Sequence, residues 1–445
     1  MTTVHKQLTF QLDALSAERS LRRRLAEFAQ SVAYLRDPRV AEVCRRLWAG
    51  DEATGGLVGQ LWVEGLFPSQ GAGCTVRDLA AEGVVASGVL RQLERSGAFP
   101  ADRELYKHQE QSIRAEAGSV SGCRPALVLT AGTGAGKTEA FLLPMMNALF
   151  REARKSDETG VRAIVLYPMN ALVNDQVERA YQWLKQQDAV KVFHFTGETP
   201  ENDEDAKREG FPVFESCRLR TREQARLHVP DILITNYSML EYMLCRPQDA
   251  VFFGKALRMF VVDEAHIYNG TLAAEIALLM RRVLLRCGVS ADQVFQMATS
   301  ATLGGEVREF AAKLFSKDEE KVHWVEGISV RPPLPPSAAP DHSPAPTDVH
   351  LDALEDATFI IDNALVEDPQ LADLARHAVA PLVRADVVAE TENQRAPARV
   401  LYHALRYSPL ISLVEDSLWR SRTDGILRLQ DLASRVWKRN DDDAL

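Results

Sequence analysis

A glycine-rich segment that could hold phosphates stands at residues 131–139, with the sequence AGTGAGKTE. It follows the apolar run ALVLT, which we expect to be a buried strand, and precedes a stretch with helical character. Glycines let a backbone wrap a polyphosphate with its N–H groups, and the start of the next helix adds a favourable dipole. The lysine would reach the β- and γ-phosphates and the following threonine hydroxyl would bind Mg²⁺. The predicted nucleotide-binding residues of this loop are Gly132, Thr133, Gly134, Ala135, Gly136, Lys137 and Thr138. Ala131 stands where the usual pattern has its first glycine.

A pair of carboxylates follows another apolar run, in the segment VVDEAH at residues 261–266. Asp263 stands where a carboxylate can hold the hydration shell of Mg²⁺ in a phosphate-loop enzyme. Glu264 is placed to orient or deprotonate an attacking water. The tripeptide SAT, formed by Ser300, Ala301 and Thr302, comes third in this order. Alone this tripeptide would indicate a turn, but its place behind the other two motifs makes it a specific functional signal.

Short apolar runs alternate with helical stretches between residues 105 and 325, and these runs must position the motifs. The predicted strands are 126–130, 163–167, 190–195, 231–235, 258–263 and 294–299. Such alternation predicts an α/β fold whose parallel sheet is covered by helices on both faces.

The three motifs in this order resemble a superfamily 2 DEAD/DEAH-box helicase, in its first RecA-like domain. The resemblance covers about residues 105–320. It implies that LYKHQ (105–109) recognises adenine, with Gln109 reading the base edge and Tyr106 packing nearby. It also implies that Ser300, Ala301 and Thr302 couple the ATP state to the grip on nucleic acid, and that His266 couples the DEAH motif to a neighbouring domain. ATP and Mg²⁺ are the implied cofactors.

Three more segments match family positions that contact a nucleic-acid backbone: LYPMNALVNDQ (166–176), FTGET (195–199) and ITNYSML (234–240). Helix capping or a turn explains each of them alone, but their order behind the motor motifs favours the functional interpretation. Contacts to phosphates and sugars would give tracking that is independent of base sequence. The predicted nucleic-acid-binding residues are Pro168, Asn170, Gln176, Thr196, Gly197, Thr235 and Asn236.

YPMNALVNDQ and TNYSMLEYML resemble a bacterial subgroup that contains mitomycin-repair helicases and Druantia-type defence helicases. The resemblance favours DNA over RNA and leaves phage defence and DNA repair both open. Members of the repair group carry a late four-cysteine zinc site, and the six scattered cysteines of this chain include no CxxC pair. The family's arginine-rich motif of a second RecA-like domain has no match in 321–445. We therefore expect a second such domain to act in cis or in trans.

Three functions compete. The first is the motor half of a helicase or translocase. The second is another phosphate-loop enzyme, such as a GTPase or small-molecule kinase, but no guanine-recognition element accompanies the loop. The third is a non-catalytic half that binds ATP and nucleic acid and acts only with a partner chain. A second RecA-like domain elsewhere would separate the first from the third.

Four segments are predicted: an N-terminal helical region (1–100), the RecA-like domain (101–325), a proline-rich linker (326–350) and a helical region (351–445). The last resembles an insertion before a second motor domain. A net charge of −10 excludes a wholly basic coat for nucleic acid but allows a local basic surface. No signal peptide or apolar run of membrane-spanning length is present, which predicts a cytoplasmic protein without a membrane partner.

Two groups of arginines raise the question of further phosphate contacts. Arg22, Arg23 and Arg24 lie in a predicted helix, where a solvated helix face is the more common arrangement than a DNA-facing patch. Arg218, Arg220, Arg222 and Arg226 follow the acidic stretch GETPENDEDAKREG. We expect residues 198–229 to form an exposed insertion with solvated arginines.

Overall fold

The structure is a computed structural model. It describes residues 14–50, 55–65, 67–119, 123–132, 134–152, 157–210, 217–268, 270–301, 307–331, 349, 352–354, 356–357, 360, 369–421 and 426–437. The chain divides into two compact units. The first comprises Pro68–Val330, and the second combines Met1–Phe67 with Arg331–Leu445.

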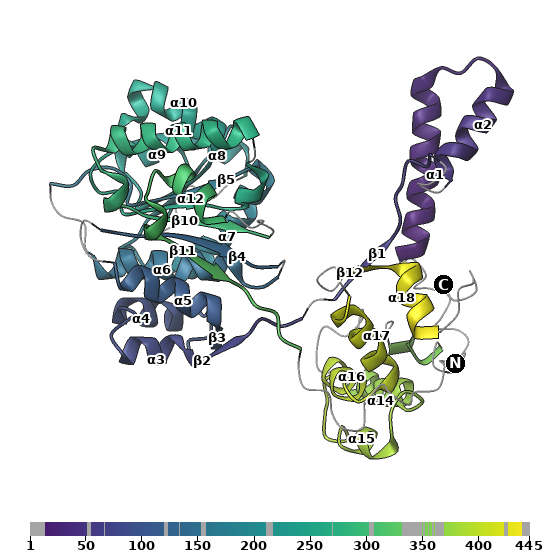
Figure 1. Ribbon diagram of the computed structural model, residues 1–445. Helices are drawn as coiled ribbons and strands as arrows, with labels where there is room; N and C mark the ends of the chain where they lie inside the picture. The colour runs from purple at the N-terminus through teal and green to yellow at the C-terminus, as the bar shows by residue number, and fades with distance from the viewer. Residues whose placement is uncertain are drawn as a thin grey trace. The chain divides into compact units, whose positions relative to one another are not determined.

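A parallel sheet forms the centre of the Pro68–Val330 unit (Figure 1). Its eight strands lie in the order β11-β4-β10-β9-β5-β8-β6-β7, and every neighbouring pair is parallel. The strands are β4 (Ala126–Thr130), β5 (Ala163–Tyr167), β6 (Val192–Phe195), β7 (Arg218–Leu219), β8 (Ile232–Asn236), β9 (Met259–Val262), β10 (Phe295–Ser300) and β11 (Val322–Glu326). The predicted α/β class with a parallel sheet is confirmed.

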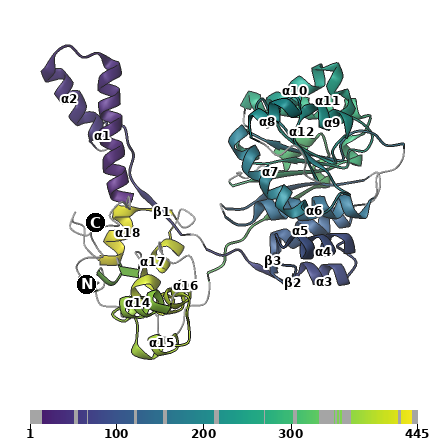
Figure 2. The same ribbon diagram turned by 180° about the vertical axis from the view of Figure 1, so that it is seen from behind.

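Helices cover both faces of this sheet, as Figures 1 and 2 show. Alternate side chains of one strand reach opposite cores, since Leu127 packs with one cluster and Val128 with the other. The first face carries α5 (Lys107–Ala117), α6 (Lys137–Arg151) and α7 (Asn170–Leu184), and the second carries α10 (Tyr237–Cys245), α11 (Gly270–Cys287) and α12 (Val307–Phe315). Short 3₁₀ turns are η2 (Pro247–Phe252), η3 (Ala265–Ile267), η4 (Ala291–Gln293) and η5 (Glu319–Lys321).

Residues 68–106 also belong to this unit. They form β2 (Gly71–Thr75), α3 (Val76–Ala81), α4 (Ser87–Ser96) and β3 (Glu104–Tyr106), with β2 and β3 paired antiparallel. The amide of Gln92 donates from α4 to the carbonyls of Trp183 (3.0 Å) and Lys185 (2.9 Å) at the end of α7. The compact unit thus begins at Pro68, whereas the sequence placed its start at residue 101.

One local prediction in this unit was wrong. Residues 198–229 were expected to form an exposed insertion. The described part instead forms α8 (Asp203–Arg208), β7 and α9 (Arg222–Leu227), and Cys217 and Ala225 are fully buried. A sheet strand of two residues is too short to leave a periodic signal.

The arginines of that segment are internal. Arg218 donates to Glu178 (2.9 Å), Arg222 donates to the carbonyl of Thr196 (3.1 Å), and Arg226 donates to the buried Asp249 (2.8 Å). Arg220 is only 8% exposed. The prediction of solvated arginines was therefore wrong, because β7 and α9 place these guanidiniums beside carboxylates and carbonyls of α7, η2 and the segment after β6.

The second unit joins the two ends of the chain. It holds α1 (Ala14–Ala33), α2 (Pro38–Ala49), β1 (Trp62–Glu64), α14 (Pro369–Val379), α15 (Ala385–Ala389), α16 (Pro397–Leu405), α17 (Pro409–Trp419), β12 (Ile426–Arg428) and α18 (Leu429–Trp437). β1 and β12 pair antiparallel, with Val63 opposite Leu427. The helical prediction for 351–445 agrees with these helices except at β12. Most of the proline-rich linker lies outside the described residues.

Candidate ATP site and nucleic-acid interface

The predicted site residues gather at one edge of the sheet. Because the strands are parallel, the segments that follow them emerge on the same side. The phosphate loop follows β4, Ser300 ends β10, and Asp263 follows β9, and these three strands are adjacent. The chain order therefore brings the three predicted motifs together at the carboxyl ends of the central strands.

The phosphate loop has the backbone that its glycines predict. Gly134 and Gly136 have φ values of 76° and 74°, in the left-handed region that favours glycine. Gly136 precedes α6 without a side-chain cap, so the first N–H groups of this helix remain available to an anion. Lys137 begins α6 and donates from Nζ to the carbonyl of Ala131 (3.2 Å). Thr133 lies outside the described residues.

Ala131, the departure from the usual glycine pattern, is accommodated by a different glycine. Its side chain is 3% exposed and belongs to the sheet core. An added Cβ on Gly327 would come within 2.5 Å of the Ala131 Cβ. The methyl group thus packs against the backbone of the segment after β11, and the absence of a side chain at Gly327 makes the room for it.

Asp263 is held in one orientation by its neighbours. The Thr299 hydroxyl donates to its Oδ1, and the backbone N–H of Glu264 donates to the same oxygen (3.0 Å). Burial raises the pKa of Asp263, and the nearby Glu264 carboxylate raises it further. A divalent cation would reverse this shift, so a buried carboxylate with raised pKa fits the predicted magnesium role. Sequence reasoning missed Thr299, although the pairing of neighbouring strands places it beside Asp263.

Glu264 lies between the phosphate-loop lysine and the histidine of the DEAH segment. Its Oε1 is 3.6 Å from Lys137 Nζ, and its Oε2 is 3.3 Å from His266 Nδ1. Within the described residues, neither Glu264 Oε2 nor His266 Nδ1 has a hydrogen bond of normal geometry, although both are buried. Glu264 also has a φ of 50°, an uncommon backbone conformation for a residue with a side chain. A carboxylate with one oxygen near the lysine and the other buried without a donor fits a site that takes a phosphate and a water.

The predicted adenine-recognition element (105–109) contacts the phosphate loop through residues at the start of α5. Gln109 accepts from the backbone N–H of Tyr106 (3.0 Å) and donates to the carbonyl of Gly136 (3.1 Å). His108, which sequence reasoning did not select, bonds through Nε2 to the carbonyl of Ala135 (2.8 Å) and stacks on the Tyr106 ring. Burial lowers the pKa of His108, which favours the neutral imidazole. Each polar atom of the Gln109 amide keeps one further bonding capacity for a ligand.

The predicted nucleic-acid segments follow β5, β6 and β8, which are also adjacent strands. These segments therefore emerge at the same end of the sheet as the phosphate loop, at the carboxyl ends of the parallel strands. Several of their side chains bond within the protein. Thr235 is fully buried and donates to the carbonyl of Phe195 (2.6 Å), and Asn236 accepts from the N–H of Met239 (2.7 Å) and caps α10. Thr196 is 1% exposed and its N–H donates to the Thr199 hydroxyl (2.9 Å).

The exposed part of this edge is made by other predicted residues. Gly197 is exposed, and Pro168 and Gln176 are half-buried. The Gln176 Oε1 is buried and has no hydrogen-bond partner among the described residues. Asn170 begins α7, but its side chain lies outside the described residues, as does the whole of Thr302. At this end of the sheet, the groups that could contact a nucleic-acid strand are therefore backbone groups and the Gln176 amide more than threonine hydroxyls.

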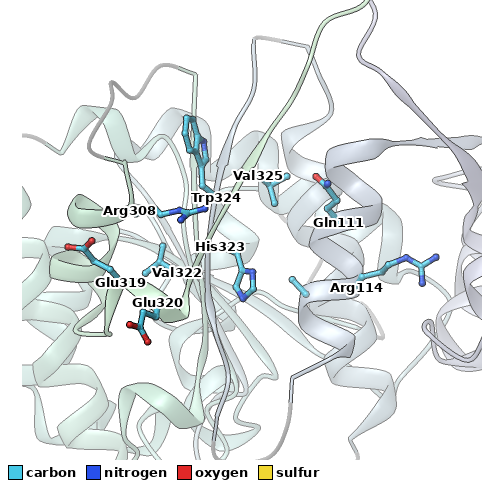
Figure 3. A pocket seen from close by; sticks show the side chains of 10 residues that line it. Gln111, Arg114, Arg308, Glu319, Glu320, Val322, His323, Trp324 and Val325 are labelled. Carbon is cyan, nitrogen blue, oxygen red and sulfur yellow. The ribbon is translucent and has the colours of Figure 1, made fainter.

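A pocket of about 550 Å³ flanks the edge strand β11 but contains none of the predicted site residues (Figure 3). Gln111 and Arg114 of α5 line it on one face of the strand, and Arg308 of α12 and Trp324 line it on the other. Trp324 Nε1 donates to the Thr130 hydroxyl (2.9 Å). Over the part of the chain that the structure describes, no group of three or more His, Cys, Asp or Glu side chains is placed to hold a metal, and no helix is long and apolar enough to cross a membrane.

Residues 106–310 match the family model of the DEAD/DEAH box helicases. The Druantia protein DruE of Escherichia coli is 30% identical over 49% of this chain and 17% of DruE. The ATP-dependent helicase hrq1 of Schizosaccharomyces pombe is 23% identical over 56% of this chain and 20% of hrq1. The chain therefore spans only about a fifth of the length of these curated relatives.

Among solved structures, the DUF1998 helicase MrfA bound to DNA matches 60% of this chain and 32% of MrfA, at 21% identity and a TM-score of 0.42. The DEAD-box helicase Mss116 bound to single-stranded RNA matches 66% of this chain and 53% of Mss116, at 18% identity and a TM-score of 0.46.

Proposed function

We propose that this chain is the first RecA-like half of an ATP-driven motor on nucleic acid, because residues 106–310 match the DEAD/DEAH box helicase family and carry the predicted motifs in order. One observation carries the proposal. Lys137 Nζ lies 3.6 Å from Glu264 Oε1, so the cation after β4 and the carboxylate after β9 meet at the open end of the phosphate loop.

ATP and Mg²⁺ fit the residues that are present. The loop N–H groups and Lys137 would hold the phosphates, and Thr138 and Asp263 would hold the cation. The bound magnesium would supply positive charge to the reacting phosphate. Glu264 would accept a proton from the attacking water through its unpartnered oxygen, and Gln109 would read the adenine edge from its place on the loop.

The strand-binding part of the proposal rests on the adjacent ends of β5, β6 and β8. Gly197 and Pro168 offer a surface without a hydrogen-bonding side chain, and the side-chain oxygen of Gln176 is buried, which supports tracking along phosphates and sugars. We favour DNA because the segments YPMNALVNDQ and TNYSMLEYML resemble the bacterial subgroup of mitomycin-repair and Druantia-type helicases. The proposal includes a second RecA-like domain in cis or in trans, a cytoplasmic location, and a role in phage defence or DNA repair.

Calorimetric titration with a non-hydrolysable ATP analogue and Mg²⁺ tests the ATP site. We expect Lys137→Ala to abolish binding while the thermal melt stays unchanged, because the lysine contacts ligand and makes only one hydrogen bond within the described protein. Lys207→Ala, at an exposed lysine of α8, is the matched control and should bind like the parent. Unchanged affinity in the Lys137 variant would contradict the proposed site.

A further inference from the structure

The two N-terminal helices form a hairpin with few buried side chains. Ala26 of α1 and Ala41 of α2 are the buried apolar residues between them, at 1% and 7% exposure. Arg22 ties the hairpin together, since it pairs with Glu18 and donates to the carbonyls of Gly50 and Gly59, the latter at 3.2 Å. The helices thus approach each other through small residues, and one arginine supplies the polar contacts.

A pocket of about 300 Å³ opens between these helices, and most of its wall is basic. Four arginines line it, namely Arg19, Arg22 and Arg23 of α1 and Arg45 of α2. Glu27 is the acidic residue of the lining, so positive charge exceeds negative charge there. Four of the seven lining residues are arginines, a much higher share than arginine has in the chain as a whole.

Two of these guanidiniums are not committed elsewhere. Arg22 is fixed by its contacts within the hairpin, and Arg45 pairs with Glu42 on the exposed face of α2. Arg19 and Arg23 are exposed and make no ion pair with the residues that the structure describes. They stand one helical turn apart, about 6 Å along α1, and both face the same pocket.

We propose that this arginine pocket binds the phosphate backbone of a nucleic-acid strand, as a contact separate from the sheet edge. A guanidinium presents a planar fork of donors that matches the oxygens of a phosphate. Two such guanidiniums one helical turn apart are better suited to bind two successive phosphates of a strand than to bind a single anion. The choice of nucleic acid as the ligand rests on the proposed function.

The test uses the full chain and a fluorescein-labelled single-stranded DNA 20-mer, with affinity measured by anisotropy across a salt series. Arg19→Gln/Arg23→Gln removes the two uncommitted charges and leaves Arg22 in place. Arg36→Gln/Arg39→Gln is the matched control, because it removes the same charge from exposed positions of the hairpin outside the pocket. Each lost phosphate contact lowers the slope of log affinity against log salt by about 0.7 for a single strand.

We expect the pocket variant to bind about tenfold more weakly at 50 mM salt, with a slope lower by about 1.4, and the control to change by less than about twofold. Equal losses in both variants would show a diffuse charge effect and overturn the pocket. Parental affinity in the pocket variant would overturn it as well. Loss of binding to phosphatidylserine vesicles, with DNA affinity unchanged, would assign the pocket to a membrane surface instead.

A further measurement, DNA affinity with and without an ATP analogue and Mg²⁺, separates this proposal from the proposed function. The motor predicts that an ATP analogue with Mg²⁺ changes the DNA affinity, whereas the pocket contributes equally with and without nucleotide. If the analogue has no effect but the pocket variant still loses affinity, the motor proposal fails and the pocket stands. If the analogue effect is intact but the pocket variant binds like the parent, the pocket fails alone.

Discussion

Arg179 of α7 donates a hydrogen bond to Glu139 of α6, two residues after the phosphate-loop lysine. The pair joins the helix that follows the phosphate loop to the helix that starts at the predicted strand-binding edge. The Glu139 side chain is 12% exposed and that of Arg179 is 42% exposed. The other carboxylate oxygen of Glu139 is buried without a hydrogen-bond partner in the described structure.

We predict that Arg179→Ala lowers the free energy of unfolding by about 1 kcal/mol, since a pair near the surface contributes little. The same change should reduce the effect of an ATP analogue on DNA affinity, because it disconnects α7 from α6. Chemical denaturation and anisotropy measure the two effects. Arg208→Ala, which removes an exposed pair with Asp205, is the control. Additive losses in a Glu139→Gln/Arg179→Ala cycle would show that the two residues are not coupled.

Thr235 and Gln176 should separate stability from strand binding. Thr235→Val keeps the shape but removes the hydroxyl that donates to Phe195, so we expect a loss of about 1–3 kcal/mol in folding stability. Gln176→Ala removes a side chain whose oxygen has no described partner, so we expect weaker DNA binding with a smaller loss of stability. Thermal melts and anisotropy on both variants check this. The reverse assignment of the two effects would contradict our description of the edge.

The positions of the motifs could be predicted from sequence because parallel strands deliver whatever follows them to one edge. Lys137, Asp263 and Ser300 each follow or end an apolar run, so the sheet had to gather them. Thr235 shows what this reasoning lacks. Its place at a strand end was correct, but whether a threonine hydroxyl faces a ligand or a neighbouring carbonyl depends on the strand beside it. That neighbour, Phe195, lies 40 residues earlier in the chain.

His108 and β7 were missed for related reasons. His108 touches the loop through the carbonyl of Ala135, and a contact to backbone leaves no sequence signature. β7 has two residues and follows a polar segment, so no alternation marks it. The pairing of β1 with β12 joins residues separated by most of the chain, and local periodicity carries no information about such partners.

His194 should make folding stability depend on pH. Burial, together with the nearby Arg218 and Arg220 charges, lowers its pKa to about 4. Because the folded pKa lies below the ordinary value of 6.5, the unfolded chain binds the proton more tightly. Stability should therefore be full above pH 6.5 and fall by up to about 3 kcal/mol as the pH drops towards 4. We expect His194→Gln to flatten this part of the profile.

Denaturation at a series of pH values measures the slope. His228→Gln, at an exposed histidine of the same unit, is the matched control and should keep the parental slope. An unchanged slope in the His194 variant would show that other groups control acid unfolding in this range.

Glu264→Gln should keep binding of Mg²⁺-nucleotide and lose hydrolysis. The substitution preserves the shape of the side chain and removes the basic oxygen that lies beside Lys137 and His266. Loss of a general base costs about 10²–10⁴-fold in rate. Steady-state turnover in a chain that includes a second RecA-like domain measures this, with binding of the ATP analogue as the control for site integrity. Parental turnover would show that another group activates the water.

The final prediction concerns turnover by residues 1–445 alone. An arginine supplied to the transferring phosphate is worth about 10³–10⁵ in rate, or roughly 4–7 kcal/mol of barrier. The described residues after Val330 form helices and the short strand β12 in the second unit, and none of them belongs to a parallel sheet. We expect these residues to supply no such arginine. This chain should therefore bind Mg²⁺-nucleotide and show little DNA-stimulated turnover.

Adding a second RecA-like domain, in cis or as a separate chain, should restore turnover, and the rescue should disappear with Glu264→Gln. ATP turnover with and without single-stranded DNA, on both forms, measures the difference. The comparison also separates the motor half from a half that only binds, since a binding module would stay inactive after the domain is added. Strong DNA-stimulated turnover by residues 1–445 alone would show that the arginine comes from within this chain.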